Sequence, residues 1–369
     1  MEKGLCEICN PKQWKTISSD MLTENGYPVY GANGIIGYYT SYNHEEPTIL
    51  ITCRGATCGT LNICESFSYV NGNAMALDNL SEEIDIRYLY YYLLSRGLSD
   101  VITGSAQPQI VRQSLAKVKV MYPPLDEQRK IAVVLDKVSN LIAKRRQQLD
   151  KLDELVKSRF IEMFGVYPAN PMGWEIGTIR DIVTEVRYGS SRPAVDGGKY
   201  PYLRMNNITY GGELDLSDTK RIDIPDNELD KCTVRRGDIL FNRTNSKELV
   251  GKTCVYDRDE MMVLAGFVIR IRVKDRILPE FLSAFLNTDF SKQMLLGMCK
   301  TAIGQANINA QELQNIGLYL PPVELQRRFV QFKKETDKSK YYSSLSSQCY
   351  RKAVNTYRQE WIKCQTSNF

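Results

Sequence analysis

The sequence contains an internal repeat at a long, fixed offset. Residues 107–129 (QPQIVRQSLAKVKVMYPPLDEQR) match residues 305–327 (QANINAQELQNIGLYLPPVELQR) without a gap, 198 positions apart. The shared residues include the Pro–Pro pairs at 123–124 and 321–322 and the Gln–Arg pairs at 128–129 and 326–327. A period of about half the 369-residue chain predicts two copies of one domain rather than a single fold.

A weaker match lies upstream in each half. The segment ILITCRG (49–55) resembles DILFNRT (238–244), which aligns Arg54 with Arg243. An aromatic-rich amphipathic helix is then expected in both halves, at residues 86–95 and 279–287. Both halves therefore share an order of strands and helices.

Runs rich in β-branched residues predict strands at 47–52, 61–64, 116–122, 262–273 and 315–320. A long helix is expected after each Pro–Pro pair, because Pro can open a helix but cannot lie inside one. The predicted fold class is α+β, with two mixed α/β domains separated by two long helices that pair as an antiparallel coiled coil. The predicted boundaries are residues 1–122 (first domain), 123–164 (central helix), 165–320 (second domain) and 321–369 (C-terminal helix).

The pairing of the helices rests on their apolar stripes. Residues 125–164 contain no Pro or Gly, and their apolar residues follow a heptad-like spacing of three and four that is interrupted at Arg145. The stripe of the first helix comprises Ile131, Val134, Val138, Leu141, Leu149, Leu152, Val156 and Met163. A second stripe follows Leu325 and Phe329. Such stripes must be buried, either against each other or in a coiled coil between two copies of the chain.

Composition excludes several classes of protein. No apolar run approaches the roughly 18–20 residues that a membrane helix needs. No secretory leader is evident, so the ten cysteines are expected as reduced thiols in the cytoplasm. The net charge is only +5, so contacts with nucleic acid must come from local clusters.

The sequence favours a protein with no catalytic residues. Its single histidine, His44, lies beside two glutamates and is expected in a surface loop. No glycine-rich cofactor loop and no Asn/Asp-Pro-Pro-Tyr/Phe motif of adenine methyltransferases is present. No cofactor and no metal are expected, although Cys6-x2-Cys9 with Cys53, Cys58 and Cys64 leaves a zinc site open as an alternative.

Polar and aromatic loop residues are the candidates for DNA binding. Asn can hydrogen-bond adenine edges, Arg can bind guanine or phosphate, and Tyr and Ser can bind phosphate. The densest cluster is FNRTNSK (241–247), and ordinary polar turns are the alternative explanation. The candidates in the first domain are Tyr27, Tyr30, Asn33, Arg54, Thr57 and Asn73; those in the second are Tyr188, Ser190, Ser191, Arg192, Arg204, Asn206, Asn207, Asn242, Arg243, Thr244, Asn245, Ser246 and Lys247.

The order of domains and helices, with its repeated Pro-Pro-x-x-x-Gln-Arg helix start, resembles the specificity subunit of type I restriction-modification systems. The resemblance covers essentially the whole chain. It implies that each domain recognises half of a split sequence in double-stranded DNA and that the helices dock two methyltransferase subunits. It further implies that S-adenosylmethionine binds the methyltransferase subunits and that two motor-nuclease subunits join for restriction. A self-sufficient DNA modification enzyme with unrecognised motifs is the alternative.

Overall fold

The computed structural model describes residues 1–104, 107–302 and 305–340. The chain divides into two compact units, and the division falls between Arg146 and Gln147, inside a 40-residue helix, α4 (Leu125–Phe164). The predicted central helix is thus confirmed. We call the described residues up to Arg146 the first domain and those from Gln147 to residue 340 the second domain.

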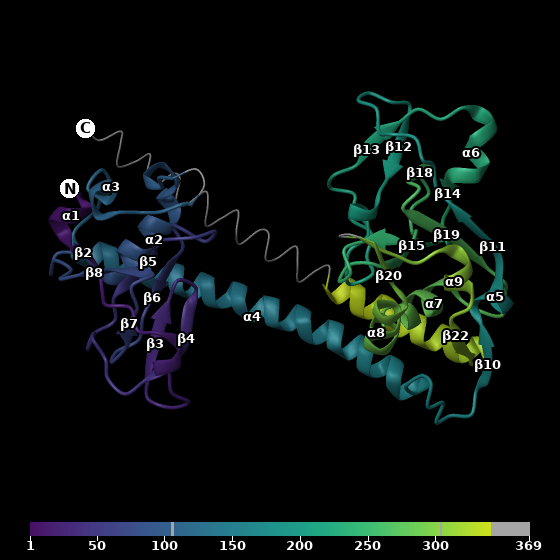
Figure 1. Cartoon of the computed structure of the whole chain (residues 1–369), viewed down its shortest axis with the longest axis horizontal. Helices are drawn as coiled ribbons and strands as arrows, with labels where there is room; N and C mark the ends of the chain where they lie inside the picture. Colours follow the sequence, from purple (N-terminus) through teal and green to yellow (C-terminus); the bar gives the residue numbers. More distant parts are fainter. Residues whose placement is uncertain (105–106, 303–304, 341–369) are drawn as a thin grey trace. The chain divides into compact units, whose positions relative to one another are not determined.

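The first domain is built from three small sheets and a few helices (Figure 1). Its strands are β1 (Glu2–Gly4), β2 (Asn10–Gln13), β3 (Tyr27–Gly31), β4 (Gly34–Tyr39), β5 (Ile49–Thr52), β6 (Leu61–Ile63), β7 (Tyr69–Val70), β8 (Ala74–Asp78) and β9 (Lys119–Met121). Its helices are α1 (Leu5–Ile8), α2 (Ile86–Arg96), α3 (Arg112–Leu115) and the first part of α4, with 3-10 turns at Ser19–Met21 and Ser99–Val101. The sheets have the orders β2-β8-β5-β6, β4-β3-β7 and β1-β9.

The second domain repeats this plan with additional elements. Its strands are β10 (Glu175–Thr178), β11 (Val183–Tyr188), β12 (Tyr200–Leu203), β13 (Lys220–Ile222), β14 (Thr233–Val234), β15 (Ile239–Asn242), β16 (Thr244–Asn245), β17 (Thr253–Val255), β18 (Met262–Leu264), β19 (Val268–Val273), β20 (Lys300–Ala302), β21 (Gln305–Asn307) and β22 (Gly317–Leu320). Its helices are α5 (Ile179–Ile182), α6 (Asp226–Cys232), α7 (Pro279–Leu286), α8 (Asp289–Met298), α9 (Ala310–Gln314), a 3-10 turn at Met205–Asn207 and a helix at 323–340.

The two domains share the topology of three sheets, to which the second domain adds β14 and a separate sheet, β16-β21-β20. The sheet β2-β8-β5-β6 corresponds to β11-β19-β15-β17, and all pairs in both are antiparallel. In each domain a parallel pair, β3 with β7 or β12 with β18, lies in a second sheet. In each domain a two-stranded antiparallel sheet, β1-β9 or β10-β22, joins the first strand of the domain to its last. The predicted duplication is therefore confirmed in three dimensions.

The conserved glutamine of each repeat makes the same buried hydrogen bonds. In the first domain, Gln128 Nε2 donates to the carbonyls of Glu83 (2.8 Å) and Pro123 (2.9 Å), and its Oε1 accepts from the backbone of Asp85 (2.9 Å). Gln128 is fully buried, and Asp85 caps the start of α2. This side chain therefore ties α4 to α2.

Gln326 repeats the arrangement in the second domain. Its Nε2 donates to the carbonyls of Arg276 (3.2 Å) and Pro321 (2.8 Å), and its Oε1 accepts from the backbone of Leu278 (2.8 Å), the residue that precedes α7. We refer to Gln128 and Gln326 as the latch glutamines, because each fixes the start of a long helix to its own domain.

The strand prediction was wrong at one position. Residues 262–273 were expected as one strand, but the structure breaks them into β18 and β19, which lie in different sheets. The break is a tight turn at residues 265–267, closed by a hydrogen bond from Val268 N to the carbonyl of Ala265 (2.9 Å). Gly266 lies at the centre of this turn, and the apolar residues on both sides of it gave no local sign of the break.

The alignment of Arg54 with Arg243 was also wrong, by one residue. Backbone hydrogen bonds run from Cys53 N to Asn73 O (3.2 Å) and from Ile110 N to Cys53 O (3.0 Å) in the first domain. In the second domain, the same two bonds are made by Arg243, with Phe267 O (3.0 Å) and Ile308 N (2.9 Å). Arg243 is therefore the counterpart of Cys53. Since alternate residues of an extended chain face opposite sides, the two arginines are not equivalent.

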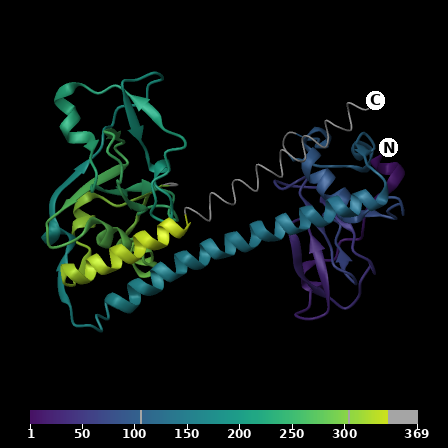
Figure 2. The same cartoon turned by 180° about the vertical axis from the view of Figure 1, so that it is seen from behind.

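The helix at 323–340 packs antiparallel to the last part of α4 (Figures 1 and 2). The ring of Phe329 lies 5.2 Å from that of Phe160 and 5.7 Å from that of Phe164. Further along, Lys340 pairs with Asp153. The predicted antiparallel pairing is confirmed for this part of the helices, and residues 341–369 of the predicted C-terminal helix lie outside the described residues.

The predicted apolar stripe of α4 is buried mainly at its two ends. Ile131 is 8% exposed in the core of the first domain, and Val156 and Met163 pack on the core of the second. Val134 and Leu141, in contrast, are 51% and 44% exposed. The expectation that the whole stripe is buried was therefore wrong for these two residues.

Candidate nucleic-acid interface

The ends of several strands meet at one edge of the first domain. The backbone of Cys53, which follows β5, bonds to that of Asn73, which precedes β8. Thr52 Oγ1 donates to the carbonyl of Ala32, in the turn between β3 and β4. The structure therefore brings together Asn33, Arg54, Thr57 and Asn73, and all four side chains are exposed.

Two predicted residues of the first domain lie elsewhere. Tyr27 is at the opposite end of β3, where its ring makes an edge contact with Tyr42 (4.9 Å). Tyr30 is only 6% exposed, and its hydroxyl accepts from the backbone of Glu65 (3.4 Å). Burial raises the pKa of Tyr30. We therefore remove Tyr30 from the candidate interface, because its side chain is part of the core.

The matching edge of the second domain carries Arg243. Its guanidinium lies over the ring of Tyr188, 4.8 Å from the centroid, in a cation–π contact, and its Nε is buried without a hydrogen-bond partner among the described residues. Within the described residues, neither Arg243 nor Arg54 forms an ion pair, so both can bind an anion without losing a carboxylate partner. Asn245 and Ser246 are half-buried nearby, and Lys247 is exposed.

Other predicted arginines of the second domain are already paired. Arg192 donates to Glu228 of α6 (2.8 and 3.2 Å), and Arg204 donates to Asp218 (2.9 Å). Neutralisation by these carboxylates weakens their attraction for phosphate. The exposed residues beside them, Ser191 and Asn206, remain accessible candidates.

Four more predicted contacts are side chains that stabilise the domain instead. Each is buried, and each uses its polar atoms on neighbouring backbone or side-chain groups. Asn207, for example, is 1% exposed and donates to the carbonyls of Asp215 (2.8 Å) and Asp218 (3.1 Å). The four are Ser190, Asn207, Asn242 and Thr244. We correct their assignment from DNA contact to support of the loops, since reaching DNA would break these bonds.

His44 is buried, so the prediction of a surface loop was wrong. It is 8% exposed, and its ring nitrogens lie 2.9 Å from Asp78 Oδ1 and 2.7 Å from Asn43 Oδ1. Trp14 Nε1 donates to the other oxygen of Asp78 (3.0 Å). These groups tie the loop before β5 to β8, a tertiary contact that has no signature in the local sequence.

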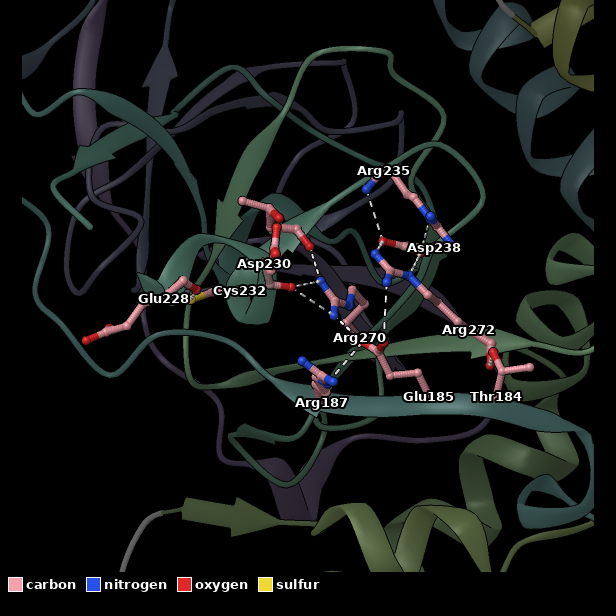
Figure 3. Close-up of polar contacts among 11 residues, drawn as sticks. Thr184, Glu185, Arg187, Glu228, Asp230, Cys232, Arg235, Asp238, Arg270 and Arg272 are labelled. Carbon is pink, nitrogen blue, oxygen red and sulfur yellow. Dashed lines mark hydrogen bonds and ion pairs between the residues drawn. The ribbon is translucent and has the colours of Figure 1, made fainter. Parts of the chain in front are cut away.

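A buried group of charges holds α6 to the main sheet of the second domain (Figure 3). Arg270 of β19 is 1% exposed and donates to Glu185 of β11 and to the carbonyl of Thr233, just after α6. Arg272 forms a forked pair with Asp238 (2.8 and 3.2 Å). In the first domain Ala76 occupies the place of Arg270, because it pairs with Leu50 as Arg270 pairs with Leu240. This ion-pair group is specific to the second domain.

The charges of this group determine the ionisation of Glu185. Burial alone would raise its pKa, but the hydrogen bond and charge of Arg270, with the charges of Arg272 and Arg187, outweigh burial and lower it. Glu185 is therefore held as a carboxylate, which serves structure rather than proton transfer.

The described residues do not contain a cluster of three or more His, Cys, Asp or Glu side chains that could hold a metal ion. The eight cysteines at described positions are free thiols. Where the structure is described, none of the helices is both long and apolar enough to cross a bilayer.

The structure defines a protein with a duplicated α/β domain and a long helix, α4, that runs from one copy into the other. The family model "Type I restriction modification DNA specificity domain" matches residues 1–154 and 171–340. The chain therefore belongs to this family.

Individual relatives are distant. The type I restriction enzyme EcoKI specificity subunit of Escherichia coli K12 is 24% identical over 249 residues, 63% of this chain and 53% of that protein. A putative specificity subunit of Haemophilus influenzae is 20% identical over 89% of this chain and 85% of its own length. Against three relatives, from E. coli and Methanocaldococcus jannaschii, the alignment spans only 36–53% of the relative's length.

Solved structures share the fold. The S subunit of a type I restriction-modification system from M. genitalium superposes with a TM-score of 0.59, at 14% identity, over 97% of this chain and 94% of that one. A chain from a structure of the type I R-M system gives a TM-score of 0.54 at 15% identity. At these identities the likeness supports the architecture, while residue roles must come from this chain's own chemistry.

Proposed function

We propose that this chain is the non-catalytic subunit that gives a type I restriction-modification complex its DNA sequence specificity. Each domain reads one half of a bipartite target in double-stranded DNA, and the helices set the distance between the halves. The protein acts in the cytoplasm, where it meets DNA.

The observation that carries this proposal is the repeated edge. The same strand ends meet in both domains, yet the side chains there differ: Asn33, Arg54 and Asn73 in one, Tyr188, Arg243 and Lys247 in the other. Two domains that share a backbone arrangement but expose different side chains are suited to recognising two different DNA sequences.

The partners follow from family membership. We propose that two methyltransferase subunits dock on the helices and that two motor-nuclease subunits complete the restriction enzyme. In this arrangement S-adenosylmethionine binds the methyltransferase subunits, and this chain supplies only the sequence contacts.

The test is to express the chain with the methyltransferase subunit of its host and to sequence methylated adenines in the genome. The expected result is one bipartite motif with a fixed gap, which disappears when this chain is deleted. Methylation at a single uninterrupted motif would contradict the proposal that each domain recognises one half of the target.

A second assay distinguishes this proposal from a self-sufficient modification enzyme. The purified chain is incubated alone with DNA and labelled S-adenosylmethionine, and then with the methyltransferase subunit added. We expect transfer of label only in the second reaction, and transfer by the chain alone would overturn the non-catalytic assignment.

A further inference from the structure

One tight turn occurs at the same place in both domains. In the first domain it is Asn71-Gly72-Asn73, between β7 and β8; in the second it is Ala265-Gly266-Phe267, between β18 and β19. The hydrogen bond that closes the turn runs from Ala74 N to Asn71 O (2.9 Å) and from Val268 N to Ala265 O (2.9 Å). We call these two segments the glycine turns.

The third residue of each glycine turn also has the same partner. The carbonyl of Asn73 accepts from the backbone of Cys53 (3.2 Å), and that of Phe267 accepts from the backbone of Arg243 (3.0 Å). Both carbonyls therefore fix the chain just after β5 or β15, at the edge where the candidate contacts gather. Asn73 and Phe267 are thus equivalent positions with very different side chains.

The glycine turn of the second domain is rigidly held. Gly266 N donates to Ser190 O (2.7 Å), Ser190 N donates to Leu264 O (2.7 Å), and Ala265 N donates to Leu203 O (2.9 Å). A side chain at Gly266 would place its Cβ 3.2 Å from Ser190 O, which is closer than most real contacts. The backbone that presents Phe267 is therefore fixed by three neighbouring segments.

Phe267 is nevertheless half-exposed, at 51%. A single exposed apolar residue is ordinary on a protein surface, so exposure alone carries no conclusion. The position of Phe267 is informative, because Phe267 lies at the rim of the candidate interface and its carbonyl accepts a hydrogen bond from the backbone of Arg243. A rigid aromatic side chain loses little entropy when it contacts a ligand.

The two side chains can read different features of DNA. Asn can form a bidentate hydrogen bond with the edge of adenine. Phe has no donor or acceptor, and the apolar group that a base pair offers in the major groove is the 5-methyl of thymine. The same turn can therefore read a hydrogen-bonding pattern in one half-site and a methyl group in the other.

Building on the proposed function, we propose that the third residue of each glycine turn determines specificity, and that Phe267 contacts the 5-methyl group of a thymine in the second half-site. Asn73 occupies the corresponding place in the first half-site. Exchange of this one residue then changes the sequence that its domain reads.

The test selects binding sequences from a duplex library randomised over both half-sites, using the full chain with its methyltransferase subunits. Wild-type protein should select a bipartite sequence with a required thymine in the half-site that Phe267 reads. Phe267→Ala should lose the preference at that one position and bind the selected duplex roughly tenfold more weakly or worse. The half-site read by the first domain should be unchanged.

A modified base measures the contribution of the thymine methyl group to binding separately from the rest of the base. Replacing the required thymine by deoxyuridine removes only the methyl group and should weaken wild-type binding roughly fourfold. The same replacement should have no effect on Phe267→Ala. Equal sensitivity of both proteins to deoxyuridine would overturn the contact.

Two further variants test whether the effect depends on the side chain at position 267 or on the loss of any exposed apolar side chain. Phe267→Asn places the first domain's residue in the second and should select a new base at the same position. Met261→Ala removes an apolar side chain of similar exposure (45%) outside the glycine turn and should select the wild-type sequence. An unchanged preference in Phe267→Ala and Phe267→Asn, with wild-type thermal stability, would refute the inference. If wild-type protein itself selects no bipartite sequence, the proposed function fails and this inference fails with it.

Discussion

Arg54 and Arg243 are the strongest candidates for contact with DNA at the scale of single residues. Both lie at strand ends on the edge that each domain exposes, and both lack a carboxylate partner among the residues described. The Arg243 guanidinium stacks on the ring of Tyr188 and its Nε is buried, so a contact with a base or a phosphate must be made by its two terminal Nη groups.

We expect Arg243→Ala to impair recognition of one half-site only. A lost bidentate contact with a base costs about 1–3 kcal/mol and relaxes the sequence preference at that position. Arg54→Ala should do the same at the other half-site. Binding of duplexes with single changes in each half-site measures both effects, and an Arg243 variant that weakens all DNA equally would identify a phosphate contact instead.

The stability of the second domain should depend on pH through Glu185. Because its pKa is lower in the folded chain than its ordinary 4.5, the carboxylate stabilises the fold fully above that value. This contribution is lost as pH falls through the folded pKa. Glu185→Gln should be less stable at neutral pH, by about 3 kcal/mol or more, because Arg270 would be left without its charge partner.

Thermal unfolding of Glu185→Gln and wild type between neutral and acid pH checks this expectation. The difference between the two proteins should shrink on acidification. Glu175→Gln, which disrupts an exposed pair with Arg276, is the matched control and should change little. A constant difference at every pH would show that the pKa of Glu185 is the same in the folded and unfolded chains, which would contradict a pKa lowered by Arg270.

At the scale of elements, the latch glutamines join each long helix to its domain. Gln128→Ala would leave the buried backbone groups of Glu83, Pro123 and Asp85 without their partner. An unsatisfied buried group costs about 1–3 kcal/mol, so we expect a loss of about 2–4 kcal/mol.

Gln326→Ala should cost about as much, because the same bonds are lost in the second domain. Gln331→Ala, one turn along the same helix and exposed, serves as the control. Chemical denaturation monitored by circular dichroism measures all three. A much smaller effect at one latch than at the other would mean that the two helices are attached differently.

Elements were predictable from the sequence where the signal is local or repeated. The repeat alone predicted both domains, and the Pro–Pro pairs with an apolar period free of Pro and Gly predicted α4. The break at Gly266 was missed, because apolar residues lie on both sides of it. The candidate site was less predictable, since a polar loop sequence cannot show that Asn207 or Asn242 turns inward. Phe267 was not among the candidates because residues 262–273 were expected as one strand, which hid its equivalence to Asn73.

At the scale of the whole molecule, α4 connects the two domains without interruption. A 40-residue helix rises about 60 Å from end to end. If each domain reads one half-site, the length of this helix contributes to the gap between them.

We expect insertion of four residues after Gln147 to lengthen that gap. The division between domains falls at this point, and Gln147 is exposed. Four helical residues add about 6 Å and rotate the far domain by only about 40°, since four residues turn a helix by roughly 400°. At about 3.4 Å per base pair, the preferred gap should grow by one to two base pairs.

Genome-wide mapping of methylated adenines in cells that carry the insertion measures the gap. Both half-sequences should stay the same, because no exposed loop is altered. An unchanged gap with full methylation would show that α4 does not set the spacing, and altered half-sequences would contradict the assignment of the reading edges.

The strand pairs β1-β9 and β10-β22 have a consequence for inheritance. Each pair brings the beginning and the end of a domain side by side, immediately before a latch glutamine fixes the next helix. A genetic crossover within the two repeated junctions would therefore replace one domain as a complete cassette and leave the helix attachment intact. If the proposed function holds, recombination at these two short stretches of coding sequence would give the chain a new DNA specificity.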